Sequence, residues 1–367
     1  MEDPSPFAHL IPYLPDEISV QIIARIPHSY HRTLCHVSRS WRSLLLGRLL
    51  LTLRSSLHCT EPTLCLSIRT QTYQSLWLVL TRGHSYSKPL PSPPLATVGS
   101  ACTTVGPFVF VLGGCLSDDL SNVVQILDLR IGGQWFLGPC MSIARECAAA
   151  SFLNGRIYAI GGCLPSSEAW AESLNLFDKN PQWVPIDSPV DLRSEFMSEC
   201  VVFSSKILAR AMGYSDAVAY DPSVVPYDPV QNTGSCSAWV SAPTGLDIGW
   251  NGSSVVVNGI LYTYDSMREI KWYNAGTDKW RPLMGIDKDL PKFLNFARLV
   301  NFNGVLCVIW PQQTFGNKRK EMMVNWVGIG VTDLGSEGLH GSILWCETVA
   351  LNMPYDSAIE HCVVAEF

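Results

Sequence analysis

FVFVLGG at residues 108–114 and IYAIGG at residues 157–162 share one order, an apolar run followed by a glycine pair. The first glycines of the two pairs, Gly113 and Gly161, lie 48 residues apart, and so do Trp135 and Trp183. A glycine pair after a buried strand permits a tight turn with positive φ. Two different landmarks with one step indicate a repeat, and the apolar runs predict that each unit is a small β-sheet.

Each unit continues with a polar loop, a second strand that ends near an acidic residue, and a tryptophan. The order is kept more loosely toward the end of the chain. Small sheets of this kind bury their faces only by stacking radially, so the sequence predicts a mainly β fold with a β-propeller over residues 59–367. One tryptophan falls in each of six units: Trp77, Trp135, Trp183, Trp239, Trp280 and Trp345.

The number of blades follows from the length of the repeat. At about 50 residues per unit, residues 59–367 give about six blades. The glycine pair is intact in only two units, so five or seven blades, and an irregular β-sandwich, stay open as alternatives. The first blade shows only two evident strands, at residues 63–68 and 75–80, and we expect the last strand, at residues 361–367, to pair with it and close the ring.

The N-terminal stretch LPDEISVQIIARIPHSYHRTLCHVSRSWRSLLL, residues 14–46, has a different pattern. Pro15 and the acidic pair after it suit the start of a helix, and Ile18, Ile22 and Ile26 recur at four-residue spacing. The sequence predicts two or three short helices with one apolar stripe. A unit of roughly 35 residues is below the size of about 40 at which a chain buries a core unaided, so we expect another surface to cover the stripe.

The helical stretch and the repeats each resemble a known family. Leu14-Pro15-Asp16-Glu17, Pro27, Val37-Ser38-Arg39 and Trp41-Arg42-Ser43-Leu44 together resemble an F-box over residues 10–48. The apolar strand, Gly-Gly, loop and Trp order resembles kelch repeats. The whole chain is similar to the plant proteins that join an F-box to a kelch propeller. The fold expected is therefore a kelch-type propeller of about six blades preceded by a small all-α F-box.

The resemblance implies a function without catalysis. F-box proteins dock onto the Skp adaptor of a cullin ubiquitin ligase, and the propeller would bind the protein to be ubiquitinated. Carried onto this sequence, the residues that contact the adaptor would be Leu14, Pro15, Ile18, Ile22, Leu34, Val37, Trp41 and Leu44. The alternative is that these residues form the core of a helical cap packed on the rest of the chain.

Composition limits the classes of function. The chain has 47% hydrophobic and 16% charged residues and a net charge of −6. Residues 1–58 carry six Arg, no Lys and four acidic residues, so the remainder has a charge of −8, which argues against a nucleic-acid binder. Thirteen cysteines without a C-x-x-C pair, and an N-terminus without a signal peptide or membrane span, predict an intracellular protein of the cytoplasm or the nucleus.

A search for chemistry in the sequence gives no catalytic constellation. Phosphate-binding and H-E-x-x-H motifs are absent, and three of the eight histidines lie in the propeller region. We therefore expect no catalytic residue, metal or cofactor; the alternative is a cofactor-binding or oxidase-like enzyme of the kelch fold. One glutamate and several Arg and aromatic residues in the turns that enter the units are candidates for binding the substrate protein, with ordinary rim or core roles as the alternative: Arg145, Arg193, Glu195, Phe196, Trp250 and Arg298.

Overall fold

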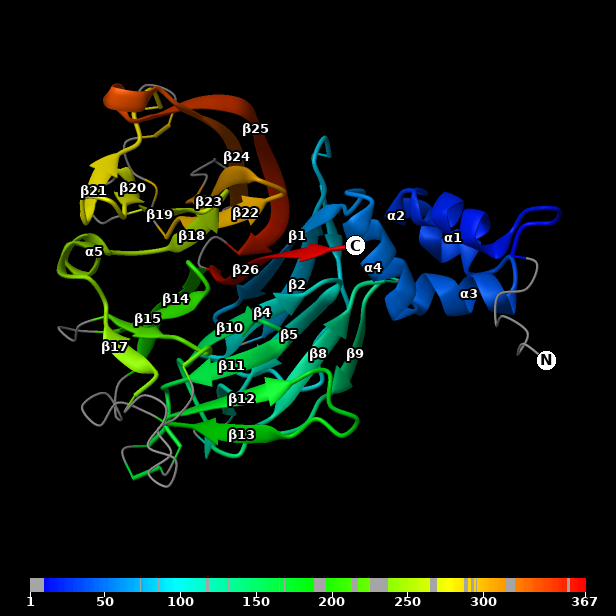
Figure 1. The fold of residues 1–367 in the computed structure, drawn as a ribbon, viewed down its shortest axis with the longest axis horizontal. Helices are drawn as coiled ribbons and strands as arrows, with labels where there is room; N and C mark the ends of the chain where they lie inside the picture. Colours follow the sequence, from blue (N-terminus) through cyan, green and yellow to red (C-terminus); the bar gives the residue numbers. More distant parts are fainter. Residues whose placement is uncertain are drawn as a thin grey trace.

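The computed structural model describes residues 10–367 except 73, 85, 117–118, 131, 165, 168, 188–195, 213–216, 225–236, 265–268, 287–289, 292–293, 295, 314–320 and 355–356. Four short helices precede a propeller of six four-stranded sheets (Figure 1). The prediction of six blades behind an all-α unit is confirmed.

All strand pairs within the blades are antiparallel, and each of blades 2 to 5 is a simple meander. Blade 2 contains β4 Ala101–Val105, β5 Phe108–Leu112, β8 Val124–Asp128 and β9 Gln134–Leu137, with a side hairpin of β6 Cys115–Leu116 and β7 Asp119–Leu120. Blade 3 contains β10 Ala149–Leu153, β11 Arg156–Ile160, β12 Ala171–Asn175 and β13 Trp183–Ile186. Blade 4 contains β14 Met197–Phe203, β15 Lys206–Ala211, β16 Val218–Tyr220 and β17 Trp239–Ser241. Helix α5, Thr244–Gly249, leads into blade 5, which contains β18 Ser254–Val257, β19 Ile260–Tyr264, β20 Ile270–Asn274 and β21 Lys279–Pro282.

Blade 6 differs from the others in the length of its strands. It contains β22 Arg298–Phe302, β23 Val305–Gln313, β24 Glu321–Asp333 and β25 Leu339–Pro354, with the 3₁₀ turn Gly335–Glu337 between the last two. Where blades 2 and 3 have a glycine pair, this blade has Ile309 and Trp310, both buried, and β23 continues beyond them to Gln313. Without glycines to turn the chain, the strand simply extends.

Blade 1 closes the ring, as the sequence predicted. It is formed by β1 Pro62–Arg69, β2 Ser75–Leu80 and β3 Ser87–Pro89, with β26 Ala358–Glu366 added on the inner side of β1. The innermost strands contact one another in the ring order β26, β4, β10, β14, β18, β22 and back to β26. Pairing the first and last parts of the chain leaves no open edge at the centre.

The tryptophans bind blades together in two ways. Trp135, Trp183, Trp239 and Trp280 lie in the outermost strands, and each donates its indole N–H to a backbone carbonyl in the segment entering its blade. The acceptor for Trp135 is Pro91 at 2.8 Å. The rings therefore fill the space between sheets, as predicted, and their N–H groups also hold the connecting segments. Trp77 lies in β2 rather than in an outer strand, and its ring meets that of Trp135 edge-on at 5.5 Å.

The glycine pairs have the backbone conformation that their position predicted. Gly113 and Gly114 have φ of 62° and 96°, and Gly161 and Gly162 both have φ of 69°. A Cβ atom on Gly113 would lie 2.5 Å from the carbonyl oxygen of Arg145. Only glycine fits this approach of backbone to backbone.

Candidate functional site

The helical unit has a small core of its own. It consists of α1 Asp16–Ala24, α2 His28–Leu34, α3 Arg39–Leu46 and α4 Arg48–Ser56, one helix more than the sequence indicated. The buried residues of this core are Leu10, Val20, Ile23, Ala24, Cys35, Leu44, Leu45 and Leu50. Leu44 is completely buried there, so its assignment to the adaptor contacts is corrected: its side chain is not accessible to a partner.

The other side of α1 carries large apolar side chains in solvent. Ile18 is 45% exposed and Ile22 43%, one turn apart on the same face of the helix, and Leu14 before the helix is 39% exposed. Pro15 is exposed as well, and Val37, in the turn between α2 and α3, is 60% exposed. We call these five residues the exposed apolar face. They include five of the eight adaptor contacts that the resemblance implied, and the predicted need for an external cover remains.

Leu34 and Trp41, also predicted as contacts, are half-buried against the core of the helical unit. The Trp41 indole N–H donates to the Leu10 carbonyl at 2.7 Å, and the Trp41 backbone N–H is capped by Ser38. Each side chain therefore has one side in the core and one toward solvent. Tyr13 and Tyr30 are further large exposed side chains of the same unit, and neither was predicted as a contact.

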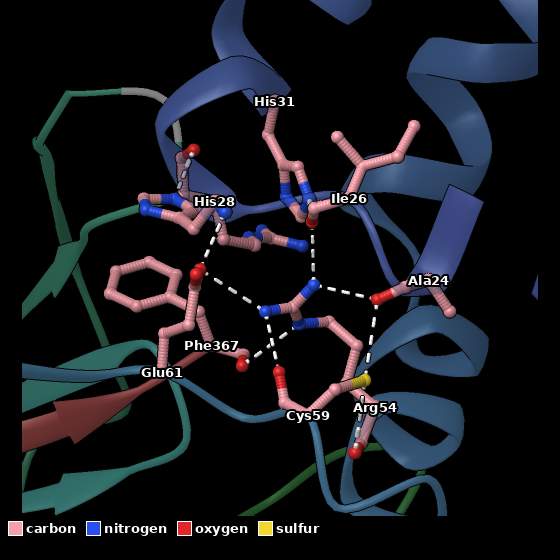
Figure 2. A network of polar contacts seen from close by, with 9 residues as sticks. Ala24, Ile26, His28, His31, Arg54, Cys59, Glu61 and Phe367 are labelled. Atoms are coloured by element: carbon pink, nitrogen blue, oxygen red, sulfur yellow. Dashed lines mark hydrogen bonds and ion pairs between the residues drawn. The ribbon is translucent and has the colours of Figure 1, made fainter. Parts of the chain in front are cut away.

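A polar joint holds the helical unit to the propeller (Figure 2). Arg54 of α4 is 1% exposed and donates five hydrogen bonds, to the carbonyls of Ala24, Ile26, Cys59 and Phe367 and to the Glu61 carboxylate. Ala24 and Ile26 belong to the helical unit, whereas Phe367 directly follows β26. One guanidinium therefore links the helices, the linker and the closing strand.

His28 makes a second set of contacts in this joint. Its backbone N–H donates to Glu61, its ring stacks on Phe367 with centroids 3.6 Å apart, and its Nε2 lies 3.0 Å from the carbonyl oxygen of Arg130 in blade 2. Since the acceptor is a carbonyl, Nε2 carries the proton. Burial lowers the pKa of His28 to about 4, so the ring is neutral at physiological pH.

The candidates on the propeller have divergent positions. Arg145 is completely buried and bonds Glu172, at 3.0 Å, and the carbonyls of Gly161, Ala169 and Trp170. Trp250 is also completely buried, with its indole N–H on Ser254. Neither presents a surface to a substrate protein, and both assignments are corrected to roles in the packing of the propeller.

Phe196 and Arg298 remain accessible. Phe196 is 50% exposed, and Arg298, at the start of β22, is half-buried and lines a cavity. Arg193 and Glu195 lie outside the described residues. The structure therefore brings one of the predicted arginines to a hollow of the surface, whereas the sequence had no signal for the hollow itself.

The cavity, of about 580 Å³, is lined by residues at or near the beginnings of β4, β10, β14, β22 and β26. The helical unit is joined at the other end of the same ring, where β1 begins and β26 ends (Figure 1). Strand β1 has eight residues and runs from the joint to Arg69 in the cavity wall. At about 3.3 Å per residue the two sites are about 25 Å apart along the axis of the propeller.

Within the described residues, no group of three or more His, Cys, Asp or Glu side chains is arranged to hold a metal ion. Among the helices that the structure describes, none is both long enough and apolar enough to cross a bilayer.

Comparisons with known proteins agree with both parts of the structure. The F-box domain model matches residues 11–52, and the model described as FKB95, Kelch-repeats domain, matches residues 63–350. F-box/kelch-repeat protein At4g39580 of Arabidopsis thaliana is 30% identical, over 99% of this chain and 95% of its own length. F-box/kelch-repeat protein At4g39240 of the same plant is 26% identical, over 98% of this chain and 92% of its own length. The chain therefore belongs to the F-box/kelch-repeat proteins of the plant type.

Proposed function

We propose that this protein is the substrate-recognition subunit of a Skp-cullin-F-box ubiquitin ligase, acting inside the cell. The F-box, with limits near residues 10–48, docks onto a Skp-type adaptor and through it joins a cullin. The propeller, residues 59–367, binds the protein to be ubiquitinated. The chain catalyses no covalent reaction; it acts by holding its substrate near the enzyme that transfers ubiquitin. The proposal involves no nucleic acid, membrane or cofactor.

The exposed apolar face is the observation that carries the proposal. Covering exposed leucine and isoleucine side chains with a partner would contribute a binding free energy of about 25 cal/mol per Å² of apolar surface removed from water. The helical unit attaches to its own propeller by the polar joint and leaves this face free. Adaptor contacts are assigned to Leu14, Pro15, Ile18, Ile22 and Val37, with the half-buried Leu34 and Trp41 at their edge.

Co-purification with a Skp-type adaptor tests the docking. The double variant Leu14→Ala, Pro15→Ala is expected to lose the adaptor, because truncated anchors at such an interface cost about 2 kcal/mol or more each. Leu49→Ala is the matched control, since Leu49 is 44% exposed on α4 and lies outside the assigned contacts. Adaptor bound by the double variant at the yield of the wild type would show that the docking assignment is wrong.

A further inference from the structure

The central cavity at the end of the propeller away from the F-box has charged walls. Arg69 and Arg298 line it from β1 and β22, and three carboxylates line it as well: Glu146, Glu199 and Glu360. Its volume of about 580 Å³ is in the range of ligand pockets, about 300–1,000 Å³.

The two arginines of the cavity are unlike the other buried arginines of the chain. Arg54 and Arg145 are bonded to several carbonyls and a carboxylate each. Among the described residues, neither Arg69 nor Arg298 has a side-chain hydrogen bond or an ion pair within 4 Å. A half-buried guanidinium offers five N–H donors in a planar fork that matches a carboxylate or a phosphate.

Two of the three carboxylates are already engaged with backbone. Glu360 accepts the N–H of Gly99 at 3.2 Å, and Glu199 accepts the N–H groups of Ser254 and Cys200. Burial raises the pKa of Glu199 to about 8 and raises that of Glu360. Glu199, the carboxyl beside Arg298, is therefore less readily ionised than an ordinary glutamate.

His361 adds no charge to the wall. Its ring Nε2 is hydrogen-bonded to the Ser100 Oγ at 2.9 Å, and burial lowers the pKa of His361 to about 3. A further guanidinium, that of Arg210, lines a side pocket of about 160 Å³ together with Glu199 and Arg298. Arg210 donates to the carbonyls of Asp247 and Trp250, so the guanidinium at β22 that has no described hydrogen bond is that of Arg298.

Exposed apolar side chains lie around the mouth. Met212 is 57% exposed and lines the cavity, and its backbone N–H bonds the carbonyl of Phe196, which is itself 50% exposed. Phe296, two residues before Arg298, is 84% exposed. Apolar side chains beside a hollow that contains a guanidinium without a described hydrogen bond suit a polypeptide better than a free ion, because both parts of the surface are then covered.

We propose that the propeller recognises its client by an acidic side chain of an extended segment, which enters the central cavity and accepts hydrogen bonds from Arg298, while the apolar side chains at the mouth cover the flanking residues. The inference rests on the proposed role as a substrate receptor. The anionic group is a carboxylate or a phosphate, since the guanidinium fork binds both.

Peptide pools test the inference on the full chain co-expressed with its adaptor. The probes are fluorescent nine-residue peptides with random flanks and a central residue fixed as Asp, Glu, phosphoserine, Asn, Gln or Lys. We expect the acidic pools to bind at least about tenfold more tightly than the Asn and Gln pools. The phosphoserine pool against the Asp and Glu pools distinguishes the two sources of negative charge. Equal binding by all pools, or preference for Lys, would overturn the proposal.

Variants connect the preference to the residue. Arg298→Gln is expected to abolish the preference for acidic pools, and Arg298→Lys to retain part of it, since charge stays but the fork is lost. Arg281→Gln is the control, because Arg281 lies over the Trp272 ring, away from the cavity. An unchanged preference in Arg298→Gln would refute the assignment; if that variant fails to fold, Arg298→Lys and Arg69→Gln replace it. Adaptor content, measured in the same samples, reports the F-box separately, so that failure of docking and failure of this inference are distinguished.

Discussion

The exposed apolar face and the polar joint belong to one helical unit of four short helices, and they differ in every chemical respect. The face consists of side chains without hydrogen-bonding groups, such as Ile18 and Ile22, and it lies in water. The joint has the buried Arg54 at its centre and is made of hydrogen bonds from Arg54 and His28 to the linker and the propeller. A chain that served only its own stability would place these surfaces the other way round.

In this arrangement, one surface sets the orientation of the helices on the propeller and a different surface supplies the affinity for a partner. Hydrogen bonds are directional, so the joint sets the angle between the helices and the propeller. Apolar burial is non-directional and roughly proportional to area, so the exposed face supplies binding energy to whatever covers it. In the proposed function, a client bound at one end of the propeller would therefore have a fixed direction from an adaptor bound at the other.

Removing Arg54 should break the joint and have the largest effect. Arg54→Met leaves several carbonyls without this donor and leaves the Glu61 carboxylate with the His28 backbone N–H alone, and we expect a loss of about 3–5 kcal/mol in the free energy of unfolding. Chemical denaturation measures the loss, and faster proteolysis in the linker at residues 57–61 shows that the helices have detached. Arg48→Met is the control, since the one described hydrogen bond of its side chain, to the Leu176 carbonyl, is exposed and long at 3.5 Å. Equal stability of the Arg54 and Arg48 variants would show that the joint is unimportant.

Two adjacent isoleucines of α1, Ile22 and Ile23, lie on different sides of the helix and allow each side to be tested by itself. Ile23 is completely buried, so Ile23→Ala should cost about 2–4 kcal/mol of stability. Ile22→Ala should leave stability within about 0.5 kcal/mol and weaken the adaptor complex instead. Thermal unfolding and adaptor titration are measured on both variants. A large loss of stability in Ile22→Ala would mean that the exposed face is part of the protein's own core.

Acid should weaken the joint by a smaller amount. The pKa of His28 is near 6.5 in the unfolded chain and about 4 in the fold. Between these pH values the unfolded chain takes up the proton and the folded chain does not. The contribution of the neutral ring to the free energy of unfolding is therefore complete above pH 6.5 and is lost as the pH falls toward 4.

The variant His28→Gln keeps an N–H donor for the Arg130 carbonyl and does not titrate in this range. We expect it to reduce the loss of stability between pH 7 and pH 4.5 by about 1–2 kcal/mol. Melting temperatures of the two proteins across this range check the difference. Part of the acid sensitivity should persist, because burial also lowers the pKa of His31 and His361. Parallel pH profiles would exclude His28 as the source.

The sequence predicted the propeller well where the repeat kept its own rules. Gly113 and Gly162 mark turns that only glycine fits, and the apolar runs before the two glycine pairs, at residues 108–112 and 157–160, lie in β5 and β11. In blade 6, Ile309 and Trp310 occupy the place of the pair, and the long strands that follow have no short-range signal. Trp77 shows the same limit. Its strand β2 is the third of four in blade 1 because β26, far away in the sequence, pairs with β1 as the innermost strand.

The candidate site shows the same division between local and distant information. Helical spacing places Ile18 and Ile22 on one face, and both are exposed. Spacing also places Leu44 on a stripe of α3, but packing against other helices decides that this residue is interior. Arg145 has the type and position of a binding residue, yet Glu172, 27 residues further along, makes it part of the core.

The closing strand β26 couples the closure of the ring to the attachment of the helical unit. Arg54 is made early in synthesis, and its partner Phe367 lies 313 residues later. A ribosome that stalls anywhere before β26 releases a chain with blade 1 unsealed and the arginine short of a partner, whatever the state of the helices. The angle between the helices and the propeller is therefore fixed only after β26 has been made.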